Sequence, residues 1–331
     1  MNRIARALAA ERADVFQAAA VAQKLSPVII EKDFWVCWTL ERLFTLPEVG
    51  ENLLFKGGTS LSKVYGVIER FSEDIDLSLS RDFLGFGGER EPELATSKTQ
   101  QRKRIEELLA AFYAATTERT LPTLHAAIAE VLGEDGWTLT PTEPGTLEFA
   151  YPLSLGSALA YIRPVVKIEM GARNDTWPAE EHPVIPFVAD VVAGTSSATV
   201  RVLAVERTFW EKVTILHDEF YRPLEKVRGE RLSRHYYDLV KLAQHPEIGP
   251  RAIARLDLLA RVAEHKEFFY RSSWSRYDLA VPGTLHLLPP PERLPDLRSD
   301  YDRMGDMFFA VPPTFDSLLE SLSALEIRLN S

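Results

Sequence analysis

The sequence has almost no cysteine and no long apolar run, and both absences narrow what the protein can be. Its 331 residues contain one cysteine, Cys37, which excludes an intrachain disulfide bond. Cys37 lies in an aromatic stretch, so we expect a buried and unreactive thiol. No apolar run has the length of a membrane span, and charges interrupt the alanine-rich N-terminal segment where a signal peptide would be apolar. We therefore expect a cytoplasmic protein.

The sequence patterns of several common enzyme classes are also missing. The seven histidines are scattered without the spacing of metal ligands, so the sequence does not support a zinc site. There is no Gly-x-x-x-x-Gly-Lys-[Ser/Thr] run, which excludes a P-loop NTPase. There is also no Gly-x-Ser-x-Gly turn of the kind that carries a nucleophilic serine. Any catalytic chemistry must come from another set of residues.

The composition is that of an ordinary globular protein, with 46% hydrophobic and 26% charged residues. The net charge of −10 argues mildly against a nucleic-acid partner held over a broad face. Two local basic groups, residues 98–104 and 222–234, are exceptions. For the first, intrahelical pairs such as Arg102 with Glu106 are the better explanation. For the second, a solvated helix face and contact with a phosphate backbone are equally good explanations.

The stretch Lys56-Gly57-Gly58-Thr59-Ser60 lies where a strand is expected to turn into a helix. Residues 52–55 are expected to form a short buried strand, and apolar residues recur at helical spacing over 61–68. The two glycines allow a close approach of the backbone and a positive φ, and Thr59 or Ser60 can cap the first turn. Free N–H groups at such a turn favour an anion, so the pattern predicts a phosphate-binding turn. Turns of this kind are common, and this one does not settle the function alone.

A pair of acids follows in Asp74-Ile75-Asp76-Leu77-Ser78-Leu79. The acids alternate with apolar residues at period two, so both carboxylates are expected on one face of a strand whose other face is buried. Neighbouring carboxylates repel each other, and a fold that places them together usually supplies a divalent cation. Oxygen ligands favour Mg²⁺ or Mn²⁺. The alternative is that Asp74 and Asp76 lie on the solvated face of an edge strand.

A third acid belongs to the strand expected over residues 161–171, in which Val165, Lys167 and Glu169 face one way and Val166, Ile168 and Met170 the other. If this strand lies beside the strand of the acid pair, then Asp74, Asp76 and Glu169 form a three-carboxylate metal site for phosphoryl transfer. Lys167 is then placed to meet a triphosphate. The alternative for Lys167 is a cross-strand ion pair with an Asp, which would contribute little to stability at a surface.

The remaining pattern predicts a mixed α/β fold with two lobes. Helices are expected over residues 7–23, 30–44, 97–132 with a break near Leu121-Pro122, 206–217, 231–244, 250–266 and 314–329. Further strands are expected over 137–141, 146–153 and 198–204. The division falls near residue 203, with a cleft expected between the lobes.

Four motifs follow one another along the chain. They are Gly57-Gly58-Thr59-Ser60 with Ser72-Glu73-Asp74-Ile75-Asp76, Val166-Lys167-Ile168-Glu169, Glu206-Arg207-Thr208-Phe209-Trp210-Glu211-Lys212, and Arg234-His235-Tyr236-Tyr237-Asp238-Leu239. In this order the motifs resemble the AbiEii-like nucleotidyltransferase family. That family includes MenT-type toxins and the toxins of type IV abortive-infection systems, which defend against phage, and of toxin-antitoxin systems. The resemblance runs from about Glu31-Lys32-Asp33 to the C-terminal stretch.

This resemblance implies a polymerase-β-like nucleotidyltransferase core over residues 1–203 and a mostly helical C-terminal lobe over 204–331. It also implies a toxin that uses an NTP and Mg²⁺ or Mn²⁺, with a cognate antitoxin as a possible partner; we expect a monomer. Some related proteins modify tRNA ends, but the acceptor does not transfer with the fold.

Carried over by position, the resemblance implies a role for each motif. The glycine turn (Gly57, Gly58, Thr59, Ser60) would hold the triphosphate, Asp74, Asp76 and Glu169 the metal ions, and Lys167 a phosphate. The nucleotide would also contact Glu206, Lys212, Arg231 and Arg234. Here the chain departs from the family pattern, which leaves open whether Glu206 or Glu211 is the functional acid. Glu206 and Lys212 are six positions apart and do not project from one line of a helix.

Three functions remain to be separated. The first is a metal-dependent toxin that transfers NMP from an NTP to an acceptor hydroxyl, most plausibly of RNA such as the 3′ end of tRNA, and releases pyrophosphate. The second keeps this chemistry with a small-molecule or protein acceptor. The third is a non-catalytic nucleotide-binding protein, against which the acid pair and Lys167 argue.

Overall fold

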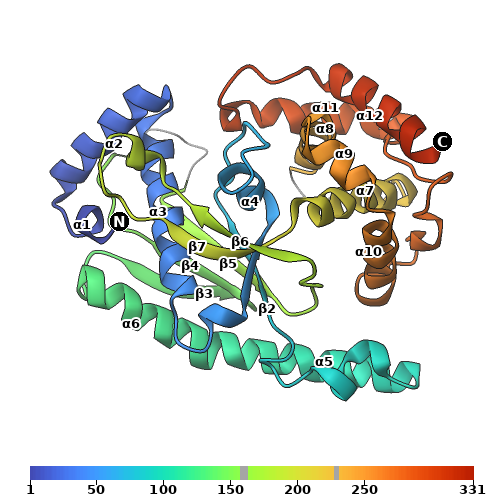
Figure 1. Cartoon of the computed structure of the whole chain (residues 1–331), viewed down its shortest axis with the longest axis horizontal. Coiled ribbons are helices and arrows are strands. Elements are labelled where there is room, and N and C mark those ends of the chain that lie inside the picture. Colours follow the sequence, from blue (N-terminus) through green and yellow to red (C-terminus); the bar gives the residue numbers. More distant parts are fainter. Residues whose placement is uncertain (157–162, 227–230) are drawn as a thin grey trace. The chain divides into compact units, whose positions relative to one another are not determined.

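The protein is described from a computed structural model over residues 1–156, 163–226 and 231–331. Within these ranges the chain forms two compact units (Figure 1). The first contains Met1–Val64 and Ser72–Val202, and the second contains Tyr65–Phe71 and Leu203–Ser331. Residues 65–71 thus belong with the C-terminal part of the chain, although they lie between two elements of the first unit. The division into domains at residue 203 stays a prediction.

The first unit is built on a seven-stranded mixed sheet with the order β3-β4-β5-β2-β1-β7-β6. Strand β2 runs parallel to β5 and antiparallel to β1, β1 runs parallel to β7, and β4 is antiparallel to both β3 and β5. The predicted mixed α/β fold is confirmed. The strands are β1 Leu53–Lys56, β2 Ile75–Leu79, β3 Thr138–Glu143, β4 Thr146–Ala150, β5 Val165–Gly171, β6 Ala179–Val184 and β7 Ala198–Leu203.

Helices pack around this sheet, with α3 against β5 and α6 against β3 (Figure 1). A π-helical turn, Thr116–Thr120, joins α5 to α6 where the sequence predicted a break at Leu121-Pro122. Pro122 lies in the first turn of α6, where its missing N–H is tolerated because the turn before it is wider. The helices are α1 Asn2–Ala5, α2 Ala9–Gln23, α3 Pro27–Phe44, α4 Gly57–Lys63, α5 Lys98–Ala115 and α6 Leu121–Leu132.

Aromatic side chains of α3 form much of the core of this unit. Trp35 and Trp38 are fully buried, and the Trp35 ring lies 6.0 Å from Phe149 of β4 and 5.5 Å from Tyr151 (centroid to centroid). Such pairs stabilise beyond the area they bury. Cys37 is also buried on α3, and burial raises the pKa of its thiol, as expected for an unreactive cysteine.

The second unit is mainly helical in the described residues, as predicted. Helix α7 contacts α8, α9 and α10, and α12 packs against α8. Buried Trp210 of α7 donates its indole N–H to the carbonyl oxygen of Ala252 on α9, at 2.9 Å. The helices are α7 Val205–Tyr221, α8 Arg234–Gln244, α9 Ile248–Ile253, α10 Leu256–Phe269, α11 Leu294–Arg303 and α12 Phe315–Asn330.

Several predicted boundaries are wrong for local reasons. The helix expected over 61–68 ends at Lys63, and Gly66 beyond it has a φ of +60°. Helix α8 begins at Arg234 and not at Arg231, because Arg231 has a φ of +60°. The helix expected over 250–266 is split into α9 and α10, and the sequence did not predict β6 or α11.

Two segments used in the sequence predictions lie outside the described residues. These are residues 161–162 of a predicted strand and residues 227–230 of the second basic group. Within the described ranges, no helix is both long enough and apolar enough to cross a membrane.

Candidate active site

The glycine turn joins β1 directly to α4, as the sequence predicted. Lys56 ends β1 in an extended conformation, and Gly57 opens α4 with a φ of +81°, a conformation that favours glycine. The Ser60 hydroxyl donates to the carbonyl oxygen of Gly57 at 2.8 Å, and the Thr59 hydroxyl donates to the carbonyl oxygen of Asp74 at 2.6 Å. Both hydroxyls are buried, so they fix the shape of the turn and tie it to the residue before β2.

The turn lies against one carboxylate of the acid pair. A Cβ atom built on Gly57 would come within 1.9 Å of Asp76 Oδ2. No side chain fits there while the Asp76 carboxylate keeps its place. Gly57 is therefore needed twice, for its φ and for the space that the carboxylate occupies.

Asp76 stands at the centre of a row of polar residues across three strands. In the sheet register it pairs with Glu169 of β5 on one side and with Lys56 of β1 on the other. Residues paired in register point to the same face, so the predicted neighbourhood of the acid pair and the Glu169 strand is present. Sequence reasoning missed Lys56. Its position as the last strand residue before the glycines was the signal that could have found it.

Asp74 lies directly before β2, and the pKa of its carboxyl group is raised. Burial, and after it the negative charges of Glu73, Asp76 and Glu169, raise the pKa of Asp74 to about 6, against the opposing effect of Lys167. The backbone carbonyl oxygen of Asp74 also accepts a hydrogen bond from the Thr59 hydroxyl, which ties Asp74 to the glycine turn. Asp74 therefore links the backbone of the turn to the charge cluster.

Lys167 and Glu169 lie on the half-buried face of β5, opposite buried Val166, Ile168 and Met170, as predicted. They form an ion pair, and this contact raises the pKa of Lys167. The ion pair of Lys167 is thus with Glu169 of its own strand and not a cross-strand pair with an Asp, and the charge of Lys167 also acts on Asp74.

We tested whether these side chains suit a divalent cation. In the part of the chain that the structure describes, no group of three or more His, Cys, Asp or Glu side chains is already arranged to hold a metal ion. The donor set is nevertheless all carboxylate oxygen, which Mg²⁺ and Mn²⁺ prefer. Burial is the largest cause of the raised pKa of Asp74, and the charges of neighbouring carboxylates add to it, so that a bound cation would offset part of the effect. Asp74 and Asp76 therefore fit such an ion, and the participation of Glu169 stays a prediction.

The predicted residues of the second unit are engaged in contacts of their own. The Arg251 guanidinium donates to Glu206 at 2.7 Å. Lys212 is buried and donates to Asp238 at 2.8 Å, and it lies 2.9 Å from His235 Nδ1. The sequence argument that Glu206 and Lys212 project in different directions agrees with these separate partners.

Asp238 lies at the centre of this second cluster. Arg70 donates to both of its carboxylate oxygens, at 2.8 and 2.9 Å. Burial alone would raise the pKa of Asp238, but the charges of Arg70 and Lys212 hold it below its ordinary value.

The choice between the two acids of α7 stays open. Glu211 lies 3.5 Å from Arg207, and Glu206 is paired with Arg251. The backbone N–H of Arg231 donates to Asp300 at 2.9 Å, and Arg234 opens α8. A nucleotide-binding role for Arg231 and Arg234 stays a prediction.

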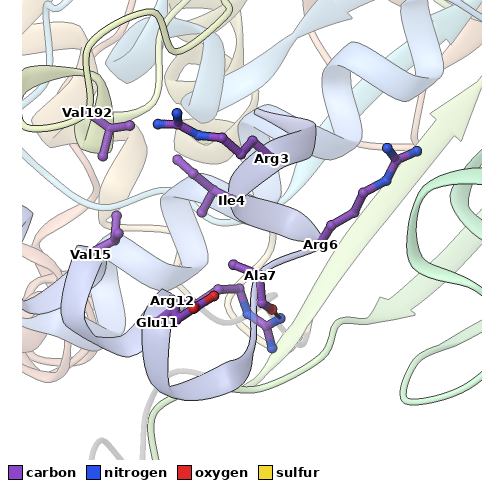
Figure 2. Close-up of a pocket in the computed structure, with 8 residues that line it drawn as sticks. All are labelled: Arg3, Ile4, Arg6, Ala7, Glu11, Arg12, Val15 and Val192. Atoms are coloured by element: carbon purple, nitrogen blue, oxygen red, sulfur yellow. Dashed lines mark hydrogen bonds between the residues drawn. The ribbon is translucent and has the colours of Figure 1, made fainter.

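A pocket of about 600 Å³ lies elsewhere in the first unit, and none of the candidate residues lines it. Figure 2 shows its lining side chains, which come from α1, α2, the stretch between these helices and Val192. Arg12 at its edge is buried and donates to the carbonyl oxygens of Ala7 and Pro152, which marks it as part of the scaffold.

Comparison with known families decides the identity. Residues 38–321 match the family model described as nucleotidyl transferase AbiEii toxin, type IV toxin-antitoxin system. The chain belongs to this family. It is a nucleotidyltransferase toxin, which implies an NTP substrate and an antitoxin partner.

The AbiEii match extends over both units of the chain and includes every candidate residue. Among solved structures, the chain is similar to MenT4, a nucleotidyltransferase toxin from Mycobacterium tuberculosis H37Rv. The two are 19% identical, the match covers 95% of this chain and 98% of MenT4, and the TM-score is 0.42. A search of curated protein sequences returned no match to this AbiEii-family toxin.

Proposed function

We propose that the face formed by Asp74, Asp76, Lys167 and Glu169 is the active site, and that it transfers NMP from an NTP to an acceptor hydroxyl with Mg²⁺ or Mn²⁺ bound. The observation that carries this proposal is the register of β2 and β5, which sets Asp76 beside Glu169 and against the glycine turn. Three elements that are distant in sequence thus contribute to one face of the sheet.

In the proposed reaction the acceptor oxygen bonds to the α-phosphorus, the bond to the β-phosphate oxygen breaks, pyrophosphate leaves, and the hydroxyl proton passes to water. When bound, the divalent cation would neutralise charge on the triphosphate and orient the reacting oxygens. Asp74 and Asp76 would hold it, with Glu169 as the third acid. The backbone of Gly57 and Gly58 would lie against the phosphates, in a turn shaped by the Thr59 and Ser60 hydroxyls.

Lys167 would stabilise the negative charge that develops on the transferring group. It is half-exposed, and its charge already acts on Asp74 across the two strands. A fixed cation contributes most where water is excluded, as it is when substrate covers the face. For Lys167 to contact the phosphate, its ion pair with Glu169 would have to open, or its ammonium group would have to contact both groups at once.

We infer further that the acceptor is RNA, such as the 3′ end of tRNA, and that the toxin acts in the cytoplasm. Support for RNA comes from the resemblance to proteins that modify tRNA ends. Incubation of the protein with each labelled NTP, Mg²⁺ and total RNA tests this directly. Label in RNA supports the proposal, label in protein or in a small molecule redirects it, and label in no product with any of the four NTPs contradicts nucleotidyl transfer.

A further inference from the structure

Three consecutive charged residues, Glu31, Lys32 and Asp33, are buried in the first turns of α3. Lys32 is only 1% exposed, and a charged residue is rarely buried so deeply without a reason. Each of the three contacts a different segment of the first unit, and the segments that Lys32 and Asp33 contact adjoin the proposed active site.

Lys32 holds the entries of the two strands that carry the acids. Its ammonium group lies 3.1 Å from Glu73, the residue before Asp74. It also donates to the carbonyl oxygens of Arg163, at 2.9 Å, and of Val165, where β5 begins. Because β2 and β5 are parallel neighbours, the first residues of the two strands lie at the same end of the sheet, and the Lys32 side chain reaches both.

Asp33 makes the equivalent contact with the glycine-turn helix. Its carboxylate lies 2.6 Å from the ammonium group of Lys63, the last residue of α4, and accepts the N–H of Phe187 at 2.8 Å. Glu31 accepts the N–H groups of Ser154 and Leu155 at 2.7 and 3.2 Å. One helix turn therefore holds α4, the entry to β2 and the entry to β5.

Burial of an ammonium group costs desolvation energy that a single ion pair does not generally repay, so stability is a weak explanation for Lys32. Burial lowers the pKa of Lys32, and the charges of Glu73 and Asp74 oppose this effect. The contacts of Lys32 instead fix the distance between the start of β2 and the start of β5. Phosphoryl transfer depends on such distances, because small displacements of reacting groups slow it strongly.

We propose that Lys32 is a positioning residue for nucleotidyl transfer, which acts by bridging Glu73 on the approach to β2 and the carbonyl groups at the start of β5. The proposal rests on the proposed function. Lys32 would touch no substrate and would act through Asp74, Lys167 and Glu169.

The test compares Lys32→Met, which keeps the stem and removes the charge, with Lys32→Arg and with a matched control. Arg12→Met is the control, because Arg12 is also a buried cation of this unit, but it donates to the carbonyl oxygens of Ala7 and Pro152 and to the Ser154 hydroxyl, none of which lies at the start of β2 or β5. Steady-state transfer is measured at a temperature at which circular dichroism shows each variant folded. The melting temperature is recorded for each.

We expect Lys32→Met and Arg12→Met to lower the melting temperature similarly. Only Lys32→Met should lower kcat, by at least about tenfold per folded molecule, with the KM for NTP changed less than threefold. Lys32→Arg should recover part of kcat because it retains the charge. Equal kcat in folded Lys32→Met and Arg12→Met overturns the positioning role, whereas a wild-type protein without transfer activity contradicts the proposed function itself.

Hydrogen exchange of the wild-type protein and the variants tests the role of Lys32 without a measurement of activity. Lys32→Met should increase exchange in peptides that cover residues 73–79 and 165–171 more than Arg12→Met does. If Lys32→Met does not fold, Glu73→Gln, which removes the other half of the bridge, takes its place in both measurements. Unchanged exchange and kcat in the folded Glu73→Gln variant then overturn the proposal.

Discussion

At the scale of single residues, the site is defined by charges that the fold holds close together. Asp74 has a folded-state pKa of about 6, raised from an ordinary value of 3.8 by burial and by neighbouring carboxylates. An acid with a raised folded-state pKa destabilises the fold once it ionises. Its contribution is therefore favourable below pH 3.8 and is lost as the pH rises through about 6.

This pH dependence of stability predicts how Asp74→Asn behaves, because asparagine cannot ionise. Without metal, the variant should be more stable than wild type at pH 7.5, by up to about 3 kcal/mol, and the advantage should vanish near pH 4. Melting curves from pH 4 to 8 with a chelator present give the measurement. Added Mg²⁺ should stabilise wild type above about pH 6 and leave the variant nearly unchanged. A stability difference that is independent of pH would show that Asp74 is not held in this charge cluster.

Lys167 gives the second prediction at this scale. Lys167→Ala should lower turnover by about a hundredfold or more, corresponding to roughly 3 to 4 kcal/mol, because a preorganised charge near the α-phosphoryl group is lost. The melting temperature should barely change, since the Lys167–Glu169 pair is half-exposed and contributes little to folding. Lys167→Arg should recover only part of the rate. An alanine variant that loses stability but keeps its rate per folded molecule would assign Lys167 a structural role.

At the scale of elements, the glycine turn and β2 work as one unit. Gly57→Ala forces a side chain into the place of the Asp76 carboxylate and strains a φ of +81°. Gly133→Ala is the matched control, because Gly133 has a φ of +79° and open space around its Cα. Both changes strain a backbone conformation that favours glycine and should lower the melting temperature, but only Gly57→Ala should also lower transfer, by about tenfold or more. Equal activity in the two variants would show that Asp76 is not confined by the turn.

The sequence predicted this strand–turn–helix–strand segment and the two faces of β5 because alternation and glycines are local signals. It missed β6, whose residues include two glutamates and a proline, because such a composition is tolerated at the edge of a sheet, where β6 lies. It also missed the contacts of Lys32 and the place of Lys56 beside Asp76. Those depend on strand order and register, which no local pattern contains.

At the scale of the whole molecule, the AbiEii family match makes growth arrest the expected phenotype. Expression of the wild type in bacteria without antitoxin should arrest growth, and Asp76→Ala should relieve the arrest at an equal protein level. Glu180→Gln, a change on β6 of the same sheet, should leave the arrest intact. Arrest by the Asp76→Ala variant would separate toxicity from the proposed active site.

The most direct test of the central claim is transfer of label from α-labelled NTP to acceptor by wild type, Asp74→Asn, Asp76→Asn and Glu180→Gln, with Mg²⁺ present. Each variant is first shown to be folded by its melting curve. We expect transfer and pyrophosphate release by wild type and Glu180→Gln. Either aspartate variant should be slower by about a thousandfold or more, because each removes a proposed metal ligand. Wild-type rates in folded Asp74→Asn or Asp76→Asn would contradict the assignment of this strand face as the active site.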